Sequence, residues 1–178
     1  MDTVYNDETT GPFIQTFKFV KSGVLFGILH ETKTARSMKE GIDMLESLLG
    51  TETFRKYVNV LLTDRGTEFT AADAIEAASD GTRRTRIFYC DPMQSGQKGT
   101  LENKHIELRY ILPKGVDLRA LGLTDQNSLN LVLCHINSIY LFIQVEFSPA
   151  FQKNAAKAHC FSVQKNKLNP LCFSACAN

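Results

Sequence analysis

Three acidic residues stand at positions from which their side chains could act together on a cation. Asp64 directly follows an apolar run, VNVLLT, that is typical of a buried strand. Glu102 follows a glycine-interrupted loop and lies in the first turn of a predicted helix, where the macrodipole favours a carboxylate. Asp2 stands at the start of the chain, on what we interpret as the remnant of a strand. One interpretation of this pattern is a carboxylate cluster.

The chemistry that such a cluster would support is phosphoryl transfer with divalent ions. Mg²⁺ takes oxygen ligands and keeps several of its waters, so a few carboxylates suit it when substrate phosphates supply the rest. Two such ions, about 4 Å apart, activate the attacking oxygen and stabilise the leaving oxygen. Structural roles fit the same residues: a turn at Asp64, a helix start at Glu102 and a chain terminus at Asp2. Spacing alone leaves both interpretations open.

Basic residues surround the predicted helix. Arg109 lies seven residues after Glu102, which places it two turns later on the same helix face. Its guanidinium suits a bidentate contact with phosphate, or support of the Glu102 carboxylate. Lys98, Lys104 and Lys114 could line a path for DNA. The alternative is scattered surface charge, which we favour for the trio of Arg83, Arg84 and Arg86.

The elements that must position these residues alternate between strands and helices, which indicates an α/β fold. Thr34 is predicted to cap a helix that runs to Leu49, with Gly50 as its stop. The expected strands are 13–20, 24–29, 57–63 and 86–90, and the other expected helices are 71–78, 100–110 and one from Thr124 through His135.

The two longest motifs resemble a known family. LLTDRGTEF followed by CDPMQSGQKGTLENKHIELRYILPKG is similar to the catalytic core of DDE transposases of the IS-thirty insertion-sequence type. The interval from Asp64 to Glu102, 102 − 64 = 38 residues, is compatible with that family, as is the basic residue seven positions after Glu102. The resemblance implies a ribonuclease H-like fold, a five-strand mixed sheet flanked by helices. It would place Asp2 on the first strand, Asp64 beyond the fourth, and Glu102 on a helix against them.

The resemblance also implies a function. Asp2, Asp64 and Glu102 would be the catalytic acids and would hold two Mg²⁺ or Mn²⁺ ions. The reaction would be cleavage of DNA at the element's end, followed by attack of the freed 3′-hydroxyl on target DNA. The partners would be transposon ends, target DNA and a second copy of the enzyme, with no small-molecule cofactor. The alternatives are an inactive transposase remnant and a nuclease of the same fold acting on RNA–DNA hybrids.

The resemblance covers residues 1–137. We therefore predict an integrase-type catalytic core over 1–137, truncated at its N-terminus, and a divergent tail over 138–178. The tail has no acidic residue after Glu146 and contains three of the five cysteines, as a reading-frame slip would produce. Impaired activity of this chain is the corresponding expectation.

The composition describes one ordinary soluble domain. The chain has 178 residues, a net charge of +1 and 43% hydrophobic residues, which is enough apolar material for a core. The near-neutral charge argues against a dedicated nucleic-acid arm, although a local basic patch can still contact DNA. The most apolar window, 129–147, contains too many polar residues to span a bilayer comfortably. We expect a cytoplasmic protein with reduced cysteines.

Overall fold

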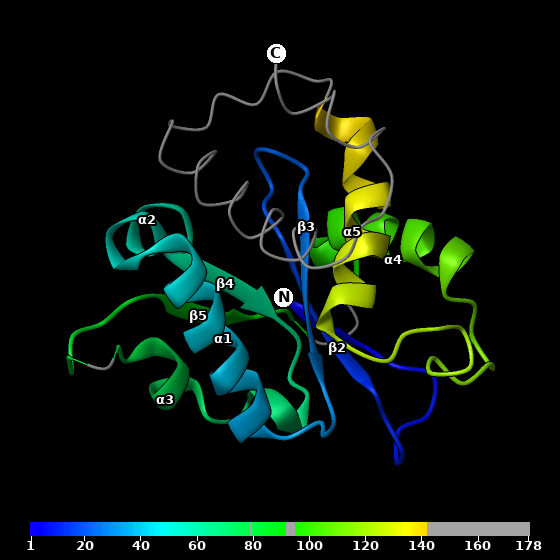
Figure 1. Cartoon of the computed structure of the whole chain (residues 1–178). Helices are drawn as coiled ribbons and strands as arrows, with labels where there is room; N and C mark the ends of the chain where they lie inside the picture. Colours follow the sequence, from blue (N-terminus) through cyan, green and yellow to red (C-terminus); the bar gives the residue numbers. More distant parts are fainter. Residues whose placement is uncertain (79, 92–94, 142–178) are drawn as a thin grey trace.

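A three-stranded antiparallel sheet lies at the centre of the computed structural model of this chain (Figure 1). Its strands are β1 (Asp2–Val4), β2 (Phe13–Lys18) and β3 (Leu25–His30), in that spatial order. Their register pairs Asp2 with Thr16 across β1 and β2. The structure describes residues 1–78, 80–91 and 95–141.

Side chains from this sheet enter two separate cores because successive residues of a strand point to opposite faces. Ile14 and Leu25 are buried in one core, and Phe17 and Ile28 are buried in the other. Helices cover both faces, with α1 on one side and α4 and α5 on the other (Figure 1). The sheet is therefore the middle layer of three.

The first face is covered mainly by α1 (Ala35–Leu49), followed directly by α2 (Thr51–Tyr57). The Thr34 hydroxyl accepts a hydrogen bond from the Ser37 amide at 3.1 Å, which confirms the predicted cap. Gly50 has a φ of 79°, a conformation that glycine adopts without steric cost, and it ends α1 as predicted.

The opposite face carries α4 (Gly99–Ile111) and α5 (Gln126–Leu141). Asn137 of α5 binds the backbone of Leu25, accepting from its amide at 2.9 Å and donating to its carbonyl at 2.8 Å. Gly27 allows the close approach, because a Cβ there would lie 3.2 Å from a methyl group of Leu133. This buried polar contact anchors α5 to the edge strand.

A second sheet pairs β4 (Val60–Thr63) and β5 (Arg86–Tyr89) in parallel. The short helix α3 (Ala72–Glu76) and the 3₁₀ turns η1 (Thr67–Phe69) and η2 (Ser95–Lys98) complete the described elements. The α-amino group of Met1 donates to the Leu62 carbonyl at 2.7 Å, so the chain ahead of β1 contacts β4. The structure is thus α/β with two small sheets, and the single ribonuclease H-like sheet stays a prediction.

Several element boundaries differ from the prediction. Tyr57 is the last residue of α2, a short helix that was not predicted, and not the first residue of a strand. The buried side chain of Phe54 packs this helix against the core. Asp125, not Thr124, caps α5, since its carboxylate accepts from the Ser128 amide at 2.8 Å. That helix continues to Leu141, so the predicted boundary at residue 137 falls inside it. Most of the predicted tail lies outside the described residues.

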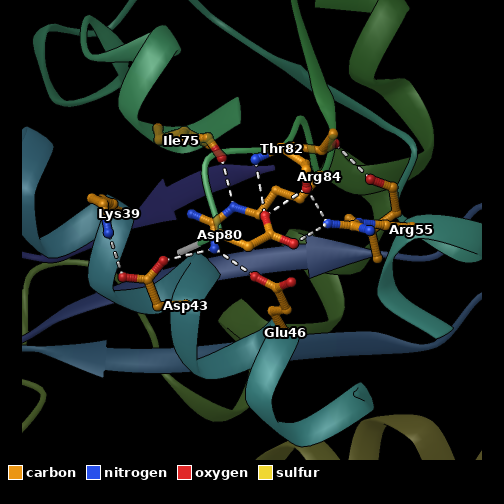
Figure 2. Close-up of polar contacts among 10 residues, drawn as sticks. Lys39, Asp43, Glu46, Arg55, Ile75, Asp80, Thr82 and Arg84 are labelled. Carbon is orange, nitrogen blue, oxygen red and sulfur yellow. Dashed lines mark hydrogen bonds and ion pairs between the residues drawn. The ribbon is translucent and has the colours of Figure 1, made fainter. Parts of the chain in front are cut away.

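An ion group around Arg84 ties α1 to the segment that enters β5 (Figure 2). Its guanidinium contacts Asp43 at 2.7 Å and Glu46 at 2.8 Å, and its Nε donates to the Ile75 carbonyl at 2.8 Å. The Arg84 side chain is only 1% exposed. Assigning it to scattered surface charge was therefore wrong, because packing against α1 buries it beside two acids.

Within the described part of the chain, no helix combines the length and the apolar character needed to cross a bilayer.

Candidate active site

Two of the predicted acids, Asp2 and Asp64, meet at the ammonium group of Lys98. The Lys98 Nζ lies 3.0 Å from Asp2 Oδ2 and 3.0 Å from Asp64 Oδ2. Asp2 is paired with Thr16, so both residues lie on the α4 face of the sheet. Asp64 arrives from the other sheet, directly after β4. Residues separated by 62 positions, 64 − 2, are thereby joined through one cation.

Local hydrogen bonds hold Asp64 in its ionised form. The Gly66 amide donates to Asp64 Oδ1 at 3.0 Å, in a tight turn, while Lys98 binds the other oxygen. Burial opposes ionisation, but these bonds outweigh it and keep the pKa of Asp64 below its ordinary value. For Lys98, burial is likewise outweighed by the two carboxylates, which raise its pKa. Asp64 and Lys98 are therefore both charged at neutral pH.

A third carboxylate, Glu68, lies against the same turn. A Cβ placed on Gly66 would be 2.5 Å from Glu68 Oε2 and 3.1 Å from Asp64 Oδ1. Glu68 is buried, and its other oxygen is 3.7 Å from the Lys33 ammonium. The acids named from the sequence as candidate ligands, Asp2, Asp64 and Glu102, do not include Glu68. The feature of the sequence that could have linked Glu68 to the site is its position in the short DRGTEF run, four residues after Asp64.

Thr16, His105 and the Met1 amine form the protein-facing side of the site, around Asp2. The Thr16 hydroxyl donates to the Asp2 carbonyl at 2.9 Å and therefore accepts from His105 Nε2, also at 2.9 Å. His105 Nδ1 lies 3.9 Å from Asp2 Oδ2. Burial lowers the pKa of His105 to about 4, against the opposing charge of Asp2, so the ring is uncharged at pH 7. Burial also lowers the pKa of the Met1 amine to about 6.

Glu102 lines a groove that starts at Thr3, the residue after Asp2. It lies in the first turn of α4, as predicted. The groove has a volume of about 740 Å³ and runs between α4 and the segment that follows β1. Arg109 and Lys114 line it, together with the 84% exposed ring of Tyr110. Acidic, basic and aromatic side chains therefore share one surface next to Asp2.

Arg109 has a positioning role within that groove. Its guanidinium donates to the Tyr5 carbonyl at 2.9 Å and to the side chain of Asn6. Asn6 in turn donates to the Pro113 carbonyl at 2.8 Å. These bonds hold the chain that leaves β1 against the C-terminal end of α4, so the strand of Asp2 and the helix of Glu102 are neighbouring elements.

Lys104, also predicted to contact DNA, points away from this groove and into the protein. Its side chain is 1% exposed, and its ammonium lies 2.7 Å from the Glu107 carboxylate. Because its side chain is buried, we do not assign Lys104 to contact with DNA. Helical periodicity could not reveal this, because the buried face of α4 is set by the packing of α5 and the sheet.

The arrangement fits a cation site only in part. Among the residues that the structure describes, no group of three or more acidic, histidine or cysteine side chains lies close enough to hold a metal ion. Glu102 is thus not gathered with the two aspartates. Asp2 and Asp64 alone do converge on a positive charge, which shows that their oxygens can share one cation.

Comparison with known proteins gives one informative match. A 58-residue segment is 40% identical to the transposase for insertion sequence element IS1086 of Cupriavidus metallidurans. The matched segment is 33% of this chain and 16% of that transposase. No protein-family model matches the chain. The chain therefore contains a transposase-like segment.

Proposed function

We propose that this chain carries the catalytic core of a DDE-type transposase, which cuts and joins DNA with divalent metal ions. The observation that supports it best is the convergence of Asp2 and Asp64 on one positive charge, 3.0 Å from each. The transposase-like segment supports the same assignment from the sequence side. Glu102 lies in the first turn of α4, lines the groove that starts at Thr3, and would complete the set.

The fold that this proposal requires is a single ribonuclease H-like sheet. The hydrogen bond from the Met1 amine to the Leu62 carbonyl supports it, because it puts the start of β1 beside β4. Continuing that contact would give the strand order β3-β2-β1-β4-β5 and a mixed sheet. In such a sheet Asp2 lies on β1, and Asp64 directly follows the adjacent strand β4.

Each residue then has a role. Asp2 and Asp64 would hold one Mg²⁺ or Mn²⁺ ion, and Glu102 would approach from α4 to share a second. When bound, the ions supply a Lewis acid for phosphoryl displacement. Lys114 would contact DNA phosphates in the groove, and Arg109 would keep the β1 segment and α4 together. Neutral His105 would exclude a competing positive charge from the inner side of Asp2.

Binding of Mn²⁺ and nicking of supercoiled plasmid test this proposal together. The parent chain should bind Mn²⁺ by calorimetry and nick the plasmid slowly when Mn²⁺ is present. Asp64→Asn should lose both properties, because it removes a negative charge at the point of convergence. Asp73→Asn, an exposed acid on α3, should keep both.

Two results would count against the proposal. Mn²⁺ binding by Asp64→Asn as tight as that of the parent would show that the metal lies elsewhere. Cleavage of an RNA–DNA hybrid with no nicking of duplex DNA would favour a nuclease over a transposase.

A further inference from the structure

Lys98 occupies the position that the proposed function gives to a metal ion. Its ammonium is held 3.0 Å from an oxygen of Asp2 and 3.0 Å from an oxygen of Asp64, and the side chain is 10% exposed. The sequence placed Lys98 among the residues that contact DNA. In the structure its ammonium is committed to the two carboxylates instead.

We propose that Lys98 and a divalent ion compete for Asp2 and Asp64, and that metal binding releases Lys98 to contact a DNA phosphate. This inference rests on the proposed function, since it takes the two aspartates as metal ligands. It adds a coupling to that function, because binding of the metal ion would free the same lysine that then contacts the DNA backbone.

Charge and size make the two occupants mutually exclusive. A bound Mg²⁺ lies about 2.1 Å from its carboxylate oxygens, inside the space between Asp2 and Asp64 that the ammonium now faces. An ammonium and a divalent ion at that separation repel strongly, while the carboxylates gain more from the doubly charged ion. The lysine stem is long and flexible, so its charge can move by several ångströms without a change of backbone.

The position of Lys98 in the chain favours its transfer to phosphate. Lys98 is the N-cap residue of α4, at the positive end of a 13-residue helix, where a cation is unfavourable. The two aspartates offset that cost in the present arrangement. Once a metal neutralises the two aspartates, they no longer offset that cost. A DNA phosphate near the start of α4 would then be favoured by the positive end of the helix dipole and by the lysine itself.

Calorimetric titration with Mn²⁺ tests the competition directly. Lys98→Met should bind Mn²⁺ about tenfold more tightly than the parent, because the competing charge is gone. Lys98→Gln, whose side chain is one atom shorter but keeps a hydrogen-bond donor, should show the same gain. Lys98→Arg keeps the charge and should bind as weakly as the parent. Lys21→Met removes an exposed lysine from the turn between β2 and β3, away from the groove lining, so its affinity for Mn²⁺ should be unchanged.

The release step has its own readout, which is the effect of Mn²⁺ on binding of a short fluorescent DNA duplex. Mn²⁺ should strengthen DNA binding by the parent relative to EDTA, and it should strengthen binding by Lys21→Met by the same factor. In Lys98→Met and Lys98→Gln that strengthening should shrink at least about threefold, because the released ammonium is missing.

The outcomes separate this inference from the proposed function. If the parent binds Mn²⁺ and Asp64→Asn does not, the metal assignment stands. Unchanged or weaker Mn²⁺ binding in both Lys98→Met and Lys98→Gln would then overturn the competition alone. Thermal melts in EDTA show whether each variant is folded. The proposal also requires that Mn²⁺ strengthen DNA binding by the parent chain, and this result does not depend on the folding of any variant. If no form of the chain binds Mn²⁺, both proposals fail.

Discussion

The guanidinium of Arg109 donates a hydrogen bond to the backbone carbonyl of Tyr5 at 2.9 Å. This contact joins α4 to the segment that leaves β1, across 104 residues of sequence. It gives a structural meaning to the basic residue two helical turns after Glu102. Through it, the strand that carries Asp2 and the helix that carries Glu102 are fixed to each other.

Replacing Arg109 with lysine should loosen this junction. A lysine cannot reach the Tyr5 carbonyl and the Asn6 side chain from one planar group, so we expect a loss of about 1–2 kcal/mol in the free energy of unfolding. Urea denaturation measures it. Arg83→Lys, where the side chain is 62% exposed, is the matched control and should change stability by less than about 0.5 kcal/mol. Equal effects of the two variants would refute the positioning role of Arg109.

Removal of the buried guanidinium of Arg84 should have a larger effect. Arg84→Met leaves Glu46, whose side chain is 13% exposed, without its charged partner, and we expect a loss of about 3 kcal/mol or more. Adding Glu46→Gln to that variant should recover part of the loss. Arg36→Met, at an 88% exposed side chain of the same region, should be nearly neutral. A small effect of Arg84→Met in chemical denaturation would show that the group in Figure 2 contributes little.

A methyl group at Gly66 should disturb the acids around it. The new Cβ would lie 2.5 Å from Glu68 Oε2, and buried Glu68 has little room to withdraw. We expect Gly66→Ala to cost about 1–2 kcal/mol and to weaken Mn²⁺ binding, because Asp64 shares the turn. Adding Glu68→Ala should restore stability. At Gly99 a Cβ meets nothing within 4 Å, so Gly99→Ala should be neutral or slightly stabilising in thermal melts.

Stability should also depend on pH through His30. Burial lowers the pKa of His30, against the opposing charge of Glu40, and its Nε2 lies 3.0 Å from Gln15 Oε1. As pH falls below about 6.5, the ordinary histidine pKa, His30 of the unfolded chain takes up a proton before His30 of the folded chain does. The contribution of neutral His30 to the free energy of unfolding is therefore complete above that pH and is lost as pH falls. His30→Gln should reduce the slope of unfolding free energy against pH between about 5 and 7. His135→Gln, at an exposed position on α5, should leave the slope as in the parent.

Several elements were predictable because their signals are local. The cap at Thr34, the stop at Gly50 and the start of α4 near Thr100 depend on hydrogen bonds between residues at most four apart. The strands of the first sheet were predicted within two residues at each end, since the runs of apolar and aromatic residues that form them are visible in the sequence. Helix α2 was missed because its one buried anchor, Phe54, carries no periodic pattern.

The sequence by itself determined which residues could do chemistry, namely Asp2, Asp64 and Glu102 with a basic residue two turns later, and it determined the α/β alternation that carries them. Only the tertiary structure decided their partners. Strand register placed Asp2 opposite Thr16, and packing across the two sheets brought Lys98 between Asp2 and Asp64. The same packing buried Lys104. The reason is physical. A helix or a turn forms from residues that are neighbours in the chain, whereas the partner of a charged side chain depends on which segments, far apart in the sequence, pack against each other and exclude water.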